Sequence, residues 1–129
     1  MHKPYLIDGL KFDMRIYVLI YGVDPLRIFV FREGLARFAT EEYVAPGKKN
    51  IDNLHMHLTN YAINKNAENF NANKDANEDD QGHKRSITSV FKLIEENEPQ
   101  SGVTAKKLWA QIDDIFIKTI ISTQPQLCH

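Results

Sequence analysis

The sequence predicts an α+β domain in which an antiparallel sheet is followed by two helices. Residues 12–21 and 26–32 have the extended pattern of strands, and the first of these stretches is apolar on most of both faces. Between residues 104 and 122 apolar residues instead recur every three or four positions, which is typical of a helix packed on one side. With 129 residues, 43% of them hydrophobic and 26% charged, the chain has the size and balance of one globular domain, which excludes a large multidomain enzyme with all its parts.

The sheet is predicted to be a meander of three strands. Alternating side chains indicate a first strand over residues 12–21, and a Gly-Val-Asp-Pro turn over 22–25 leads into a second strand over 26–32. The Glu-Gly pair at 33–34 is expected to break the second strand, so that residues 35–40 run back as a third.

The rest of the chain is predicted to contain loops and helices. Residues 41–53 resemble an exposed loop, and the asparagine-rich residues 64–80 predict a flexible loop. Helices are expected over 86–96 and 104–122. We expect the second helix to pack on the sheet through an apolar stripe of Leu108, Ile112, Ile115, Phe116 and Ile120.

Charge and cysteine content limit the partners and the compartment. The 16 basic and 17 acidic residues give a formal charge of -1, so no field over the whole chain favours nucleic acid or an anionic membrane. No apolar run approaches the roughly 20 residues that a membrane helix needs. The single cysteine, Cys128, cannot form an intramolecular disulfide, which favours a reducing compartment. We therefore expect a soluble cytoplasmic protein without nucleic-acid or membrane partners.

Charged residues gather at the start of the first predicted strand. Lys11, Asp13 and Arg15 stand at alternate positions, so a pleated strand projects them to one side, and Arg37 from the third strand can join them. One interpretation is a solvated sheet face with cross-strand ion pairs. The other is a site for a polyanion such as a nucleotide with its metal, because burying these charges without a counter-ion would be costly.

Two other polar stretches could carry chemistry. Residues 55–61 contain His, Thr, Asn and Tyr side chains suited to hydrogen bonds with a ligand. His55 and His57 would share a face if this stretch were extended, which is compatible with a zinc site, but further ligands at suitable spacing are missing, so simple hydrogen bonding is favoured. Lys84 and Arg85 form a basic pair whose roles could be solubility or anion binding.

Three ordered motifs closely resemble the tubulin tyrosine ligase-like family. They are residues 3–19 (KPYLIDGLKFDMRIYVL), 31–38 (FREGLARF) and 57–65 (HLTNYAINK). The resemblance continues through two further segments, residues 82–86 (GHKRS) and 113–121 (DDIFIKTII), so it covers nearly the whole chain. Within the family, residues 24–29 and 34–40 look most like the polyglutamylases.

This resemblance implies an ATP-grasp ligase that activates a carboxylate as an acyl phosphate and joins it to glutamate through an amide or isopeptide bond. The residues expected at the ATP are Lys11, Phe12, Asp13, Thr59 and Asn60. Those expected at the incoming glutamate are Arg37, Tyr61, Ala62 and Lys84. Arg15, facing the phosphates or the acyl intermediate, and Arg37 are the expected catalytic residues. The implied cofactors are ATP and Mg²⁺, the implied partners are free L-glutamate and tubulin C-terminal tails, and the implied location is the cytoplasm, on microtubules, a cilium or a basal body.

The sequence also departs from the family pattern. The segments with further ATP-binding lysines and with the acidic and Asn ligands of magnesium are missing, so residues 1–129 resemble the central part of the ATP-grasp domain, truncated at both ends, with no metal ligand of its own. One hypothesis is therefore a glutamate ligase represented by an inactive fragment. The alternatives are a non-catalytic remnant or tubulin-binding module, and a tubulin glycylase. The pairs 48–49 and 106–107 are candidate contacts for acidic tails, although paired lysines are commonly only solvated.

Overall fold

The parts of the chain described by the computed structural model are residues 3–68, 70 and 82–127. Most of the loop predicted over residues 64–80 lies outside these ranges, as does Cys128, although Asn64 itself ends a helix and is buried. The predicted exposed loop over residues 41–53 is confirmed, because this stretch contains neither helix nor strand and most of it is exposed. Among the described residues, no helix combines the length and the apolar character that crossing a bilayer requires.

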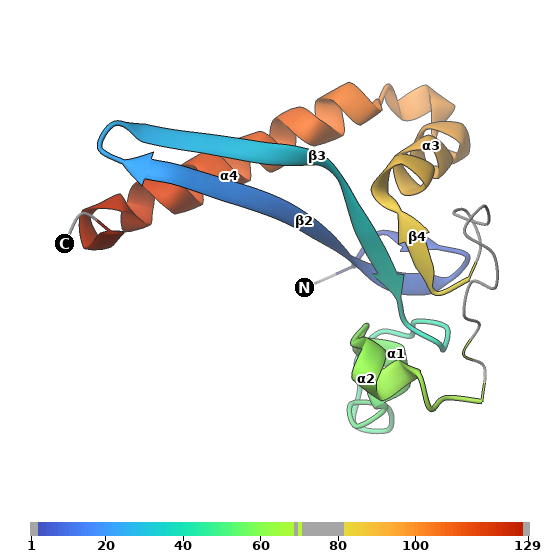
Figure 1. The fold of residues 1–129 in the computed structure, drawn as a ribbon. Helices are drawn as coiled ribbons and strands as arrows, with labels where there is room; N and C mark the ends of the chain where they lie inside the picture. The colour runs from blue at the N-terminus through green and yellow to red at the C-terminus, as the bar shows by residue number, and fades with distance from the viewer. Residues whose placement is uncertain (1–2, 69, 71–81, 128–129) are drawn as a thin grey trace. The chain divides into compact units, whose positions relative to one another are not determined.

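The antiparallel sheet predicted from the sequence is confirmed, and it has four strands (Figure 1). In their order across the sheet these are β1 (Leu6–Ile7), β2 (Leu10–Val23), β3 (Leu26–Phe38) and β4 (Lys84–Ser86). β1 pairs with the start of β2, with Leu6 opposite Lys11. β4 pairs with the end of β3, with Arg37 opposite Lys84.

The predicted third strand over residues 35–40 is wrong. β3 continues without a break from Leu26 to Phe38, and Gly34 lies inside it. The strand that pairs with residues 35–37 is β4, which comes from a distant part of the sequence. A glycine weakens a strand, but pairing with a partner on each side outweighs that local tendency.

The chain divides into two compact units, and β2 and β3 run through both. Unit 1 contains Met1–Arg15 and Leu35–Ile87, and unit 2 contains Ile16–Gly34 and Thr88–His129.

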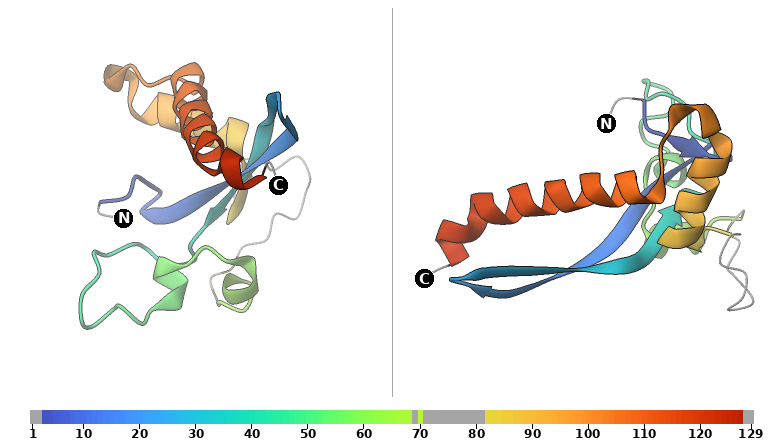
Figure 2. Two further views of the ribbon diagram at one scale, coloured as in Figure 1. Left: turned by 90° about the vertical axis from the view of Figure 1, so that its left-hand side faces the viewer. Right: turned by 90° about the horizontal axis from the view of Figure 1, so that it is seen from above.

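Unit 1 packs the ends of the strands against two short helices. α1 (Leu54–His57) and α2 (Tyr61–Asn64) contact each other (Figure 2). The amide of Thr40, just beyond β3, donates to the carbonyl of His55 at 3.1 Å, which joins α1 to the sheet. The buried apolar residues of unit 1 are Ile7, Ala36, Phe38, Ala39, Met56 and Ile87.

Unit 2 packs a long helix along the hairpin formed by β2 and β3. The predicted helices are confirmed as α3 (Ile87–Asn97) and α4 (Ala105–Leu127), with a 3₁₀ turn at Pro99–Ser101 between them. α4 lies beside β3 (Figure 1), where Arg32 donates to both carboxylate oxygens of Asp113 at 2.8 and 2.9 Å.

The contact between α4 and the sheet confirms the predicted packing of this helix. An apolar cleft lies between them, lined by Leu26, Ile28, Val30, Phe116, Ile117 and Ile121. Of the predicted stripe, Ile120 is buried and Ile112 and Phe116 are half-buried, but Ile115 is exposed. Ile112, Phe116 and Ile120 are spaced four residues apart and so lie on one narrow side of the helix. Ile115 is outside this series and lies beyond the edge of that side.

Candidate active site

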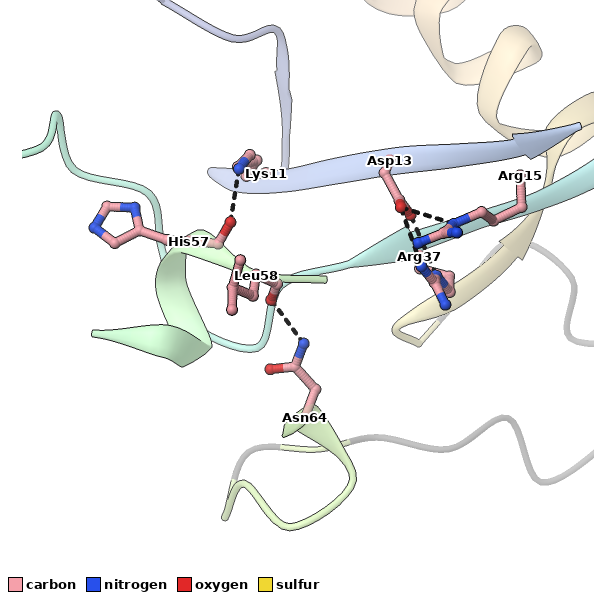
Figure 3. Close-up of polar contacts among 7 residues, drawn as sticks. All are labelled: Lys11, Asp13, Arg15, Arg37, His57, Leu58 and Asn64. Atoms are coloured by element: carbon pink, nitrogen blue, oxygen red, sulfur yellow. Dashed lines mark hydrogen bonds and ion pairs between the residues drawn. The ribbon is translucent and has the colours of Figure 1, made fainter. Parts of the chain in front are cut away.

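Three of the four predicted charged residues meet on one face of the sheet in unit 1 (Figure 3). The Asp13 carboxylate accepts from Arg15 Nε at 2.9 Å and from Arg37 Nη2 and Nε at 3.1 and 3.3 Å. Alternation along β2 places Asp13 and Arg15 on the same side, and the neighbouring strand β3 supplies Arg37. The predicted association of these three side chains is confirmed, and we call them the Asp13 cluster.

The Asp13 cluster can bind a further anion. It contains two guanidinium groups and one carboxylate, which leaves one net positive charge. A guanidinium carries five N–H donors. Within the described ranges, both Nη groups of Arg15 and the Nη1 group of Arg37 make no hydrogen bond to protein. The Arg15 side chain is 50% exposed and that of Arg37 23% exposed, so ligand oxygens can approach these donors.

Lys11 has a different partner. Its Nζ donates to the carbonyl oxygen of His57 at 2.6 Å (Figure 3), which ties the beginning of β2 to the end of α1. The last carbonyls of a helix have no partner within the helix, so the ammonium satisfies one of them. Lys11 is therefore bonded to the backbone of α1 rather than to the Asp13 cluster, and all four residues lie in unit 1.

The basic pair on β4 divides between the two faces of the sheet. Lys84 is exposed and lies opposite Arg37 in the strand register, so it adds positive charge beside the Asp13 cluster. Arg85 is buried, donates from Nη2 to the Asp8 carboxylate at 2.8 Å and from Nε to the Gly82 carbonyl at 3.1 Å. Solubility therefore does not explain Arg85, which anchors β4 and so holds Lys84 in place.

Phe12 points to the other face of the sheet. Its ring stacks on Phe38, with centroids 5.2 Å apart, and the guanidinium of Arg85 lies 4.4 Å from the centre of the Phe38 ring. Alternation explains this arrangement, because Phe12 and Phe38 each neighbour a charged residue that faces the opposite way. One face of the sheet is thus charged and the other forms the core of unit 1.

The remaining predicted ligand-binding residues lie at the beginning of α2. Thr59 is buried, whereas Asn60, Tyr61 and Ala62 are exposed. Asn60 is the N-cap residue of α2, yet its side chain makes no capping hydrogen bond. The Tyr61 ring lies edge-on to Phe70, with centroids 5.8 Å apart, so this side chain is held by an aromatic contact as well as by its backbone.

The two histidines of α1 make hydrogen bonds to the protein. His57 Nε2 lies 2.8 Å from the Asn50 carbonyl oxygen, and His55 Nδ1 lies 3.3 Å from Asn64 Oδ1. The extended arrangement that the zinc alternative required is wrong, because both residues belong to a helical turn. The part of the chain that the structure describes contains no group of three or more His, Cys, Asp or Glu residues able to hold a metal.

Sequence reasoning missed Asn64 and the ion pair of Arg85 with Asp8. Asn64 stands at the start of the asparagine-rich stretch, yet it is buried and hydrogen-bonded. Nothing in composition distinguishes it from its neighbours. For Arg85, strand alternation next to Lys84 was an available signal, because it assigns the two residues to opposite faces.

Comparison with known proteins places this site in a family. The model of the tubulin-tyrosine ligase family matches residues 1–129. A probable beta-tubulin polyglutamylase of Tetrahymena thermophila is 57% identical over 129 residues, which are 100% of this chain and 10% of that protein. Tubulin polyglutamylase TTLL13 of Mus musculus is 52% identical over 98% of this chain and 15% of its own length. Tubulin polyglutamylase ttll6 of Danio rerio is 46% identical over 100% of this chain and 15% of its own length.

The chain thus spans 10 to 15% of the length of these curated relatives. The family match covers the strands, the Asp13 cluster and the α2 segment together, and it confirms the resemblance found in the motifs. The chain belongs to the tubulin-tyrosine ligase family.

Proposed function

We propose that the protein containing this chain is an ATP-dependent ligase that adds glutamate to the C-terminal tails of tubulin. The observation that carries the proposal is the Asp13 cluster, where two arginines keep N–H donors that no described residue accepts from, on a sheet face where Arg37 lies opposite Lys84. The names of the relatives, which are tubulin polyglutamylases, support glutamate as the added amino acid and tubulin as the acceptor.

The residues of unit 1 fit a nucleotide better than they fit a metal ion. Among the described residues, the two guanidinium groups of Arg15 and Arg37 outweigh the Asp13 carboxylate that they share, so the Asp13 cluster attracts phosphate and carboxylate oxygens. Asp13 is already bonded to two guanidinium groups, and no metal-binding group of acidic residues is found in the described ranges. We therefore assign no magnesium ligand to this chain and expect the metal ligands elsewhere in the full enzyme.

Each predicted residue then has a task that its position allows. When bound, ATP supplies the phosphoryl group that activates a tail carboxylate. Lys11, Asp13, Thr59 and Asn60 line the nucleotide side in this proposal, whereas Phe12, whose ring stacks on Phe38 on the other face of the sheet, contributes only its backbone. Arg15 stabilises negative charge on the transferring group. Arg37, Lys84, Tyr61 and Ala62 hold the incoming glutamate, whose amine forms the amide bond as phosphate leaves.

Catalysis in this arrangement rests on positioning and electrostatics. Two guanidinium groups repel each other, and the Asp13 carboxylate between them holds those of Arg15 and Arg37 close together. Preoriented cations stabilise the charge that develops on phosphoryl and acyl oxygens, and they do so without a reorganisation cost at the moment of reaction.

The proposal is tested by incubating the full-length protein with tubulin, ATP and labelled amino acids. We expect label from glutamate to enter tubulin only when ATP is present. Incorporation of glycine but not glutamate would show a glycylase, and tubulin binding without any incorporation would show a non-catalytic module. Either of these results would overturn the proposal.

The isolated chain of 129 residues is expected to give no incorporation in the same assay. It spans 10 to 15% of the length of its relatives, so it lacks counterparts to most of their chains. Scintillation counting of precipitated tubulin measures this directly. ATP-dependent incorporation by the chain alone would contradict the expectation.

Lys11→Ala and Asp13→Ala in the full-length protein are expected to act mainly through the nucleotide. Lys11→Ala should raise the KM for ATP about tenfold because it removes a charged hydrogen-bond donor, and Asp13→Ala should do so because it removes the carboxylate that holds Arg15. The KM for glutamate should rise less. A matched control is Lys118→Ala, which removes an exposed lysine paired with Asp114 on α4 and should leave both constants unchanged. A larger change in the glutamate constant than in the ATP constant would count against the assignment.

A further inference from the structure

A buried asparagine side chain joins three separate segments of unit 1. Asn64 is 1% exposed. Its Oδ1 accepts a hydrogen bond from the Thr40 hydroxyl at 3.0 Å and lies 3.3 Å from His55 Nδ1. Its Nδ2 donates to the carbonyl of Leu58 at 2.8 Å, the contact drawn in Figure 3. One side chain therefore connects the end of β3, helix α1 and the residue that precedes the ligand-binding stretch.

The chemistry of a carboxamide suits this place. The oxygen accepts two hydrogen bonds while the nitrogen donates one, which requires His55 to carry its proton on Nδ1. Thr40 is also buried, so its hydroxyl has little access to water as a substitute partner. Removing the carboxamide would leave buried polar groups without partners. An aspartate would accept as well but could not donate to Leu58.

The same residue fixes the backbone of residues 58–64 from both ends. Its own amide donates to the Asn60 carbonyl at 3.0 Å, while its side chain holds the Leu58 carbonyl. Thr59 and Asn60 lie between these two attachments. Because Asn60 is exposed and its side chain makes no capping hydrogen bond, the direction of this side chain depends on the backbone that the two attachments hold.

We infer that Asn64 is a positioning residue, which sets the geometry of residues 59–62 relative to the Asp13 cluster on the sheet. The link to the sheet passes through Thr40, three positions after Arg37 on the same stretch of chain. This inference rests on the proposed function, since it assumes that residues 59–62 meet the nucleotide and the glutamate. Small misplacements of such groups can lower activity strongly even when no contact residue has changed.

The first test compares Asn64→Ala with Asn50→Ala in the full-length protein. Asn50 is a matched control because its side chain also makes two hydrogen bonds, to the amide of Gly47 and the carbonyl of Ala45, but none to residues 58–64. We expect Asn64→Ala to raise the KM for ATP about tenfold, with kcat changed less, and Asn50→Ala to change neither by more than about twofold. A purely structural role would lower the amount of active enzyme, and so kcat, while KM stayed the same.

Thr40→Val supplies a milder variant in case Asn64→Ala fails to fold. Valine matches the shape of threonine but cannot donate to Asn64 Oδ1. We expect Thr40→Val to raise the KM for ATP about threefold. The double variant should have the same KM for ATP as Asn64→Ala alone, because the two substitutions break one network. An unchanged KM for ATP in Thr40→Val, together with an unchanged or unmeasurable value in Asn64→Ala, would overturn the inference.

Amide hydrogen exchange on the 129-residue chain separates this inference from the proposed function. Asn64→Ala should speed exchange at residues 63–65, whose amides bond to Asn60 and Tyr61, and leave α4 unaffected. An inactive wild-type enzyme would overturn the proposed function, and exchange would then decide the inference alone. Unchanged exchange in Asn64→Ala would overturn the inference. Faster exchange in Asn64→Ala would also overturn it if the wild-type enzyme is active and the variant keeps the same KM for ATP.

Discussion

Replacing Arg37 with alanine in the full-length protein is expected to lower kcat/KM for glutamate about 100-fold while changing ATP affinity by less than about fivefold. The guanidinium of Arg37 bonds to Asp13 through two nitrogens and keeps Nη1 for a ligand, and it lies opposite Lys84 in the strand register. A planar guanidinium can hold the Asp13 carboxylate through two nitrogens while its third donates to a ligand carboxylate, which a single ammonium cannot reproduce. Steady-state transfer of labelled glutamate and calorimetric titration with ATP measure the two effects separately.

Two further variants test whether the effect belongs to the geometry of Arg37. Arg37→Lys keeps the charge but loses the planar fork, so it should recover only part of the activity. Arg27→Ala removes an exposed arginine from the same strand and should leave both measurements unchanged. Equal losses in glutamate use and ATP binding for Arg37→Ala would argue against a glutamate-binding role.

The second large effect is expected from Phe38→Ala, which should lower the free energy of unfolding of the 129-residue chain by about 3–5 kcal/mol. Phe38 is 1% exposed and lies between the ring of Phe12 and the guanidinium of Arg85. Its removal leaves a cavity and takes away the apolar surface on which both neighbours pack. Urea unfolding followed by circular dichroism measures the change.

Phe29→Ala is the matched control for this experiment. Phe29 lies on the same strand but is 58% exposed, so truncating it should change the free energy of unfolding by about 0.5 kcal/mol or less. The contrast between Phe38 and Phe29 tests whether the face of the sheet that carries Phe12 and Phe38 forms the core of unit 1. A similar loss of stability in both variants would contradict that assignment.

Local rules predicted the central feature of the site. Asp13 and Arg15 share a face because they are two residues apart on one strand, and that relation depends only on the period of a strand. Arg37 was expected to join them from a third strand, and it does so because β3 continues to Phe38 next to β2. The helices were predicted for a similar reason, since the apolar stripe of α4 repeats within a few turns.

Contacts between distant segments account for the features that were not predicted. The length of β3 depends on β4, whose position no pattern near Gly34 reveals. Lys11 turns to a carbonyl of α1, and Asn64 is buried by residues from three different segments. Whether a polar residue is buried depends on such distant partners rather than on composition, so sequence alone assigned Asn64 to a loop.

A structure of the full-length protein with a non-hydrolysable ATP analogue and glutamate tests the central claim most directly. The account predicts that nitrogens of Arg15 and Arg37 lie about 2.7–3.2 Å from phosphate or carboxylate oxygens of these ligands. Density for both ligands away from these two arginines, with each guanidinium still bonded only to Asp13, would contradict it.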